Sequence, residues 1–196
     1  MLRFDRVVIK NGDFKLSANF EIAPGARVAV IGPSGAGKST LISALAGVLP
    51  LAQGKLCWGD HVLNEMHPGK RPVATLFQDG NLFGHLDLAA NVGLGLDPGL
   101  RLSAEQKKHV EHALERVGLA GLGARKPADV SGGQQSRAAL ARVLVQGRPV
   151  MLLDEPFAAL GPALKRDMLT LVRDVGEETG ATLMMVRHDP ADARFL

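Results

Sequence analysis

The chain has 196 residues, enough for one domain with a sizeable core. No apolar run reaches the ~18 residues of a membrane-spanning helix, and the single cysteine cannot form an internal disulfide. The N-terminus lacks the apolar core of a signal peptide, so we expect a cytosolic protein. The net charge of +3 is spread along the chain without a Lys/Arg block, so we expect no nucleic-acid binding.

The first predicted elements are strands. Residues 14–22 alternate apolar and polar side chains, the period of a half-buried antiparallel strand, and residues 2–9 are the predicted partner across an Asn11-Gly12 turn. Residues 28–31 read V-A-V-I, a short apolar and largely β-branched run that predicts a central buried strand.

A phosphate-binding motif follows that third strand. Residues 32–39 read G-P-S-G-A-G-K-S and match G-x-x-x-x-G-K-[ST], ahead of an apolar helical pattern that starts near Lys38. We expect Lys38 to reach the β- and γ-phosphates and the Ser39 hydroxyl to bind Mg²⁺. The alternative is a glycine-rich turn without a ligand. The predicted phosphate contacts are Gly32, Pro33, Ser34, Gly35, Ala36, Gly37, Lys38, Ser39 and Thr40.

Two adjacent carboxylates follow a later buried strand. The apolar run at residues 150–153 ends in Asp154 and Glu155. Asp154 suits an outer-shell Mg²⁺ role, and Glu155 is placed to polarise a water for attack on the γ-phosphate. The alternative is a solvated strand end. The sequence has no N-K-x-D motif for guanine, so ATP is favoured over GTP.

Polar residues follow two further strand-like runs. Gln78 comes directly after residues 73–77, and His188 lies two residues after residues 182–186. Parallel strands emerge on one edge of a sheet, so we expect both side chains on the same rim as Lys38 and Asp154.

Alternation of strands and helices predicts a mostly parallel sheet with an antiparallel β part at the N-terminus. We interpret residues 1–78 and 150–196 as this α/β core and residues 79–149 as an inserted helical lobe, within one domain over 1–196. Ser103 with Gln106 predicts a capping box that opens a lobe helix.

The segment V-S-G-G-Q-Q-S at residues 130–136 predicts a second anion-binding helix start. Ser131 is a suitable N-cap for a helix to about residue 145, and Gly132 and Gly133 leave its backbone N–H groups uncovered. We expect a second copy of the chain to present this surface to the ATP, giving a head-to-tail homodimer with two nucleotides at its interface.

These motifs, in this order, resemble the ATP-binding cassette (ABC) ATPases, a class of P-loop NTPases, over essentially the whole chain. The resemblance implies that Gln78 senses Mg²⁺ and the attacking water, that Ser131 and Gly133, with Gly132 and Gln134 of the same motif, contact the nucleotide of the other subunit, and that His188 holds the γ-phosphate. It implies transmembrane permease subunits as direct partners, a periplasmic solute-binding protein as an indirect one, and a peripheral position on the cytoplasmic face of the bacterial inner membrane.

Residues 81–102, N-L-F-G-H-L-D-L-A-A-N-V-G-L-G-L-D-P-G-L-R-L, are similar to the ATPase subunits of bacterial thiamine importers, as is the approach at 71–78. Related ATPases serve importers of polyamines, iron, sulfate or molybdate, which stay open alternatives. A nucleotide binder with little turnover, a non-transport ABC ATPase and a small-molecule kinase are further alternatives. Leu82, Phe83, Leu86 and Leu88 are interpreted as lobe core or as a groove for a partner helix.

Several positions depart from the pattern of the family. Gly161 stands where an aspartate is usual, and the signature continues Q-Q-S-R instead of Q-R-Q-R. No aromatic precedes the phosphate loop at the usual place, so either Phe14 stacks on adenine or adenine is held by apolar contact alone. The sequence ends eight residues after His188, where family members continue, and we therefore expect a C-terminally short form of the fold.

Overall fold

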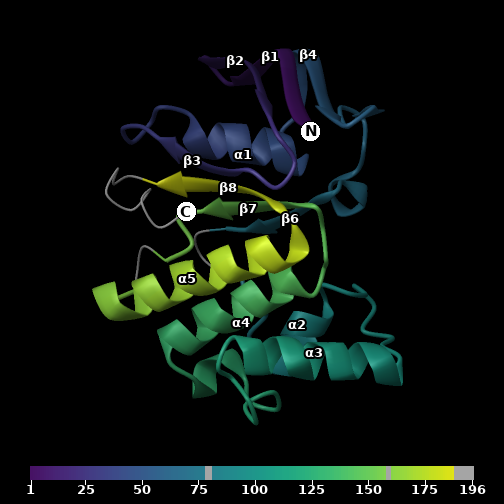
Figure 1. Cartoon of the computed structure of the whole chain (residues 1–196), viewed down its shortest axis with the longest axis vertical. Coiled ribbons are helices and arrows are strands. Elements are labelled where there is room, and N and C mark those ends of the chain that lie inside the picture. Colours follow the sequence, from purple (N-terminus) through teal and green to yellow (C-terminus); the bar gives the residue numbers. More distant parts are fainter. Residues whose placement is uncertain (78–80, 158–159, 188–196) are drawn as a thin grey trace. The chain divides into compact units, whose positions relative to one another are not determined.

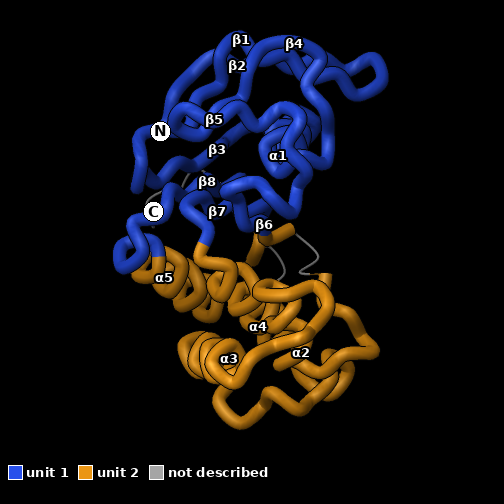
Figure 2. The backbone as a smooth tube through the Cα atoms, turned by 90° about the vertical axis from the view of Figure 1, so that its right-hand side faces the viewer, with its two compact units in different colours: residues 1–75, 148–155, 176–196 blue, residues 76–147, 156–175 orange. Residues whose placement is uncertain are grey.

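A computed structural model describes residues 1–77, 81–157 and 160–187, which form two compact units (Figure 2). Unit 1 contains residues 1–75, 148–155 and those from 176 onward, and unit 2 contains 76–147 and 156–175. The sequence interpretation placed residues 156–175 in the α/β core. In the structure they belong to the helical unit, because the helix that they begin packs on a lobe helix.

The N-terminal strands of unit 1 form an antiparallel sheet in the order β2-β1-β4-β5. Its strands are β1 (Leu2–Asn11), β2 (Phe14–Ile22), β4 (Leu51–Trp58) and β5 (His61–Val62). Asn11 pairs with Phe14 across the turn, which confirms the predicted pairing of the first two strands. Phe4 on β1 stacks on Phe20 on β2, with ring centroids 4.5 Å apart.

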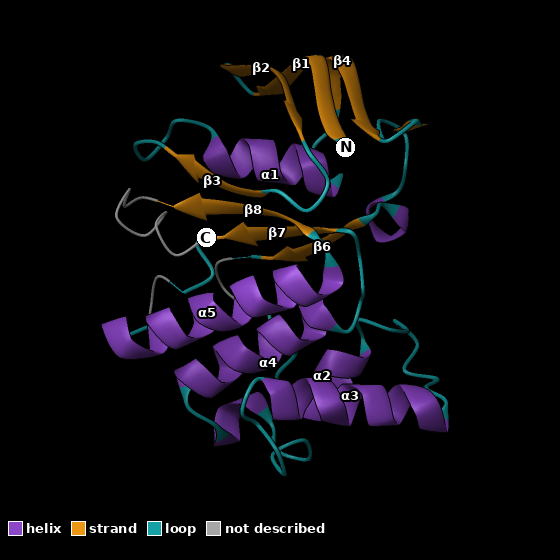
Figure 3. Ribbon diagram, in the orientation of Figure 1, coloured by secondary structure: helices purple, strands orange, loops and turns teal. Residues whose placement is uncertain are grey.

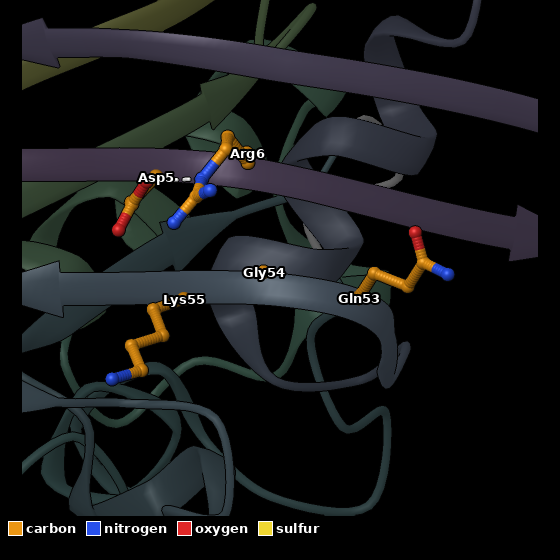
Figure 4. A pocket seen from close by; sticks show the side chains of 5 residues that line it. All are labelled: Asp5, Arg6, Gln53, Gly54 and Lys55. Atoms are coloured by element: carbon orange, nitrogen blue, oxygen red, sulfur yellow. Dashed lines mark hydrogen bonds and ion pairs between the residues drawn. The ribbon is translucent and has the colours of Figure 1, made fainter.

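A bulge interrupts β1 at Asp5 and Arg6, where the register shifts against both neighbouring strands. Arg6 has a φ of +47°, and Gly54 on β4 lies so close to the Arg6 carbonyl that no Cβ fits there. The bulge leaves a shallow hollow lined by Asp5, Arg6, Gln53, Gly54 and Lys55 (Figure 4). Arg6 Nε pairs with Asp5 Oδ1 at 3.2 Å, and Lys55 adds a second positive charge to the lining of the hollow.

The second sheet of unit 1 has the order β3-β8-β7-β6. Its strands are β3 (Arg27–Ile31), β6 (Val73–Leu76), β7 (Val150–Asp154) and β8 (Thr182–Arg187). β8 pairs in parallel with β3 on one side and β7 on the other, and β7 and β8 are buried throughout. β3 is an edge strand in the described part of the sheet, and Ile31 is 44% exposed. The prediction of a central buried strand at 28–31 was wrong there, because β3 has one neighbour instead of two.

Helix α1 (Lys38–Ala46) lies between the two sheets of unit 1, and its apolar side chains join residues of both in one core (Figure 1). Arg71, which follows the short 3₁₀ helix η1 (Pro68–Lys70), is 3% exposed and fixes the end of α1. Its Nη1 donates to the carbonyls of Ala44 at 2.7 Å and Leu45 at 2.9 Å. Burial lowers the pKa of the Arg71 guanidinium, yet it stays a cation suited to the negative end of the helix dipole.

Unit 2 is helical (Figure 3). Its elements are α2 (Leu88–Gly93), α3 (Ala104–Arg116), the 3₁₀ helix η2 (Pro127–Asp129), α4 (Gly132–Leu144) and most of α5 (Pro162–Thr179). The predicted capping box of α3 is present: Ser103 Oγ accepts from Gln106 N, and Gln106 Oε1 accepts from Ser103 N. None of the helices in residues 1–77, 81–157 and 160–187 has the length and apolar character needed to cross a membrane.

Candidate functional site

The phosphate-binding motif forms the loop between β3 and α1, as the sequence predicts. Gly35 and Gly37 have φ values of +78° and +91°, a left-handed conformation that glycine adopts without strain. Gly37 is the N-cap of α1 and offers no side-chain acceptor, so the first N–H groups of the helix have no cap. Uncapped N–H groups at a helix start bind phosphate oxygens.

Lys38 supplies the positive charge of this loop. It is 8% exposed, and its Nζ donates to the carbonyls of Gly32 at 2.8 Å and Pro33 at 3.0 Å. The ammonium therefore lies against the loop instead of extending into solvent. Ser39 and Ser34 are exposed on the same loop and first turn, where their hydroxyls can reach a ligand.

Asp154 ends β7 at the same edge of the sheet as the phosphate loop. Ile31 of β3 pairs with Arg187 of β8, and Asp154 pairs with Val186 of β8. The ends of β3 and β7 are therefore two strand spacings apart, about 10 Å. The register brings the carboxylate and the phosphate loop to one edge, as the sequence predicts.

The Asp154 carboxylate fits the expected metal. Its side chain is 9% exposed, and Oδ1 is buried without a hydrogen-bond partner among the described residues. Burying an unpaired carboxylate oxygen is costly, so such an atom in a native fold points to a ligand. Mg²⁺, which prefers oxygen ligands and keeps part of its water shell, would satisfy this oxygen.

Glu155 turns the chain sharply away from the strand. Its φ is +47°, which is uncommon for a residue with a long side chain. Its N–H donates to the Val186 carbonyl at 3.4 Å, which ties the turn to β8. Residues held in a left-handed conformation cluster at active sites, and this conformation could not be read from the sequence.

Phe14, at the start of β2, lies against the phosphate loop. A Cβ at Gly37 would be 2.6 Å from the Phe14 ring, so the ring covers that glycine. The ring is 38% exposed, whereas Ile9, another apolar residue of the region, is fully buried in the core. Of the two alternatives for adenine, the structure therefore favours Phe14 as the contact.

The segment V-S-G-G-Q-Q-S at residues 130–136, called the signature segment from here on, begins α4 with the predicted N-cap. Ser131 Oγ accepts from Gln134 N at 3.3 Å, and Gln134 Oε1 accepts from Ser131 N at 2.9 Å. Gln135, at a position where the family has arginine, donates from Nε2 to the Pro127 carbonyl at 2.9 Å. These bonds fix the helix start while the N–H groups of Gly132 and Gly133 keep no acceptor among the described residues.

The two signature glycines have different surroundings. Nothing in the described chain lies within 4 Å of a Cβ at Gly132, but a Cβ at Gly133 would be 2.6 Å from Leu164 Cδ2 on α5. The sequence interpretation left both glycines to a ligand and missed Leu164. Only the packing of α5 on α4 could reveal this second reason for a glycine.

Three further predicted positions complete the comparison with the sequence. Gln78 and His188 lie outside the described residues. Gly161 precedes α5, its carbonyl accepts from Lys165 N at 2.9 Å, and it has open space around a Cβ. The structure thus places Lys38, Asp154 and Glu155 in unit 1, and Ser131, Gly132, Gly133 and Gln134 in unit 2.

Comparison with known proteins agrees with this geometry. A model of the ABC transporter family matches residues 16–158. The ATP-binding cassette MJ0796, solved as a dimer bound to ADP and phosphate, superposes with a TM-score of 0.87 at 30% identity, over 100% of this chain and 91% of that one. The chain belongs to the ABC transporter family of ATPases, and its α/β fold is that of an ATP-binding cassette.

Within this family, curated relatives at high identity share one description. The thiamine import ATP-binding protein ThiQ of Cereibacter sphaeroides is 58% identical over 99% of this chain and 84% of its own length. The ThiQ protein of a Ruegeria species is 59% identical over the same shares. The chain is thus similar to thiamine import ATP-binding proteins along nearly its whole length.

Proposed function

We propose that this chain is the subunit that binds and hydrolyses ATP to power a bacterial thiamine importer. Thiamine as the solute is supported by the names of relatives that are 58 and 59% identical over 99% of the chain. Nucleotide hydrolysis is supported above all by the buried Oδ1 of Asp154, which has no partner in the described part of the chain and lies at the sheet edge that also carries the phosphate loop.

The residues of unit 1 divide the chemistry among them. Lys38 and the N–H groups at the start of α1 bind the β- and γ-phosphates, and Phe14 stacks on adenine. Ser39, Asp154 and Gln78 hold Mg²⁺, which neutralises phosphate charge when bound. Glu155 takes a proton from the attacking water, and His188 steadies the γ-phosphate.

The complete site needs two copies of the chain. In the proposed homodimer, Ser131 and the uncovered N–H groups of Gly132 and Gly133 of one copy bind the γ-phosphate held by the other. The MJ0796 cassette was solved as a dimer, which supports the pairing of two copies. ATP then joins the two copies, and hydrolysis releases them.

The permease contact belongs to unit 2. Of the predicted apolar cluster, Leu88 is fully buried in the lobe core, whereas Phe83 is 49% exposed. A groove nearby has an apolar floor that includes Leu114 and carries the carboxylates of Asp87 and Glu111. We infer that a short basic and apolar helix of the permease docks there, at the cytoplasmic face of the inner membrane.

Uptake assays test the solute. A bacterial strain that lacks its own thiamine-importer ATPase, but keeps the permease and the binding protein, receives this chain or its Lys38→Ala variant. Labelled thiamine uptake is expected with the wild-type chain alone. Restored uptake of spermidine, iron, sulfate or molybdate in matching strains, without thiamine uptake, would support the alternative importers instead.

Glu155→Gln tests the hydrolytic assignment. The variant is expected to bind ATP and form a stable dimer on a sizing column, while phosphate release falls by at least about 100-fold. Hydrolysis near the wild-type rate would show that another group is the base. A phosphorylated small molecule in place of free phosphate would indicate a kinase.

A further inference from the structure

Segment 81–87 is held at its C-terminal side by a fully buried amide. Asn91 of α2 is 0% exposed. Its Oδ1 accepts from Phe83 N at 2.7 Å, and its Nδ2 lies within hydrogen-bonding distance of the carbonyls of Phe83, Leu86 and Asp87. One side chain thus fixes the backbone beneath the exposed Phe83 ring, and a buried network of this kind is rigid when satisfied.

The N-terminal side of the segment is held from α4. Arg142 Nη1 donates to the Asn81 carbonyl at 2.8 Å. Asn81 has a φ of +47°, a conformation that asparagine tolerates better than most residues. Burial lowers the pKa of the Arg142 guanidinium, which stays protonated, so this bond is charge-assisted and partly shielded from water.

The backbone of Arg142 is fixed by contacts with its neighbours. A Cβ at Gly95 would be 2.5 Å from the Arg142 carbonyl, so the chain after α2 packs directly on the α4 backbone. Gln146 Nε2 donates to the same carbonyl at 3.1 Å. The guanidinium therefore extends from a backbone that cannot shift independently of α2.

Helix α4 connects the signature segment at its N-terminus with Arg142 near its C-terminus. Its first residue, Gly132, belongs to the signature segment, and Arg142 lies ten residues later, about 15 Å along the helix axis. A helix of this length moves as a rigid body. A displacement of its N-terminus therefore reaches residues 83–87 through α2 and Asn91, and it reaches the Asn81 carbonyl through Arg142.

We propose that Arg142 is the positioning residue through which the signature helix α4 sets the position of segment 81–87, and thus of Phe83. The inference rests on the proposed function in one respect: ATP on the other copy is what displaces the N-terminus of α4. Nucleotide occupancy and the partner-facing aromatic are then linked within one chain.

Hydrogen exchange read by mass spectrometry tests this link on the full chain in the Glu155→Gln background. ATP is expected to slow exchange in peptides covering both 32–40 and 81–87. With Arg142→Met, which keeps the length of the side chain but not its donors, the ATP effect at 81–87 is expected to fall about tenfold, the equivalent of one charge-assisted bond. The ATP effect at 32–40 is expected to stay unchanged. Arg142→Lys is expected to restore part of the ATP effect at 81–87.

Arg148→Met is the matched control. Arg148 Nη2 also donates to a backbone carbonyl, that of Gly69 at 3.0 Å, but in unit 1. This variant is expected to leave the ATP effect at 81–87 unchanged. Faster exchange everywhere, including α3, would mean general destabilisation and overturn the positioning role, as would an ATP effect at 81–87 that survives in Arg142→Met.

The exchange data distinguish failure of the proposed ATPase function from failure of the positioning role of Arg142. If ATP slows neither peptide, the proposed function fails. The nucleotide-free samples then decide the inference, because Arg142→Met must still speed exchange at 81–87 about tenfold relative to its parent. Equal rates in the two nucleotide-free proteins would overturn it.

Discussion

Gly133→Ala separates the two reasons for a glycine near the start of α4. The added Cβ would lie 2.6 Å from Leu164 Cδ2, about 1 Å inside normal carbon contact. Overpacking costs about 1–3 kcal/mol in a well-packed core, but Leu164 Cδ2 is the end of a half-buried side chain that can move aside, which lowers this cost. Alanine in place of a helical glycine returns at most about 1 kcal/mol. We therefore expect the substitution to lower the free energy of unfolding by less than about 1 kcal/mol.

Leu164→Ala removes the obstacle. Leu164 is half-buried, so its truncation alone costs about 1 kcal/mol. In that background the Cβ of Gly133→Ala meets only Leu160 Cδ2 and Ser131 Oγ, each at an ordinary 4.0 Å, and the substitution is expected to stabilise by up to about 1 kcal/mol, a reversal of sign. Urea unfolding of the four proteins, followed by circular dichroism, measures this coupling. Gly132→Ala, with open space around its Cβ, is the control and is expected not to lower stability.

ATP hydrolysis by the same variants tests whether a γ-phosphate also requires a glycine at position 133. If a γ-phosphate must also approach the backbone at Gly133, the double variant recovers stability but hydrolyses ATP at least about tenfold more slowly than wild type, a loss of about 1.4 kcal/mol at the transition state. Wild-type turnover in the double variant would refute the composite site. Equal effects of Gly133→Ala in both backgrounds would refute the packing argument.

Three other substitutions have defined outcomes. Asp154→Asn neutralises a carboxylate whose buried Oδ1 has no hydrogen-bond partner among the described residues, so the nucleotide-free protein is expected to melt at a higher temperature while Mg²⁺-dependent hydrolysis is lost. Phe14→Ala is expected to raise KM for ATP about tenfold with little change in kcat, since a stacking contact is lost equally in ground and transition states. The N–H groups of Gly99 and Arg101 hold the pKa of Asp97 below its ordinary value, so Asp97→Asn is expected to destabilise at pH 7.

The lowered pKa of Asp97 determines how its contribution to stability depends on pH. Its contribution is present above the unfolded-state pKa of about 3.9 and is lost as the pH falls through the folded-state pKa. Wild type and Asp97→Asn should therefore converge in stability in strong acid, and a difference that persists there contradicts the reasoning. A melting temperature of Asp154→Asn below wild type, or an unchanged KM in Phe14→Ala, would count against the other two assignments.

The sequence by itself determined the features that depend on neighbours within about four positions. The capping boxes at Ser103 and Ser131 follow from residue types three apart, and the strand at 14–22 follows from its period of two. The phosphate loop likewise follows from glycines and a lysine in one short run. Local sterics and hydrogen bonding settle such features before any tertiary contact forms.

Only the tertiary structure decided which distant residues meet. Phe14 covers Gly37, Leu164 fills the space beside Gly133, and Arg142 holds Asn81 across 61 positions. In the described part of the chain, the edge position of β3 and the Asp154 oxygen without a hydrogen-bond partner likewise depend on the strand order. These contacts are set by how whole elements pack, and no pattern of nearby residues encodes that choice.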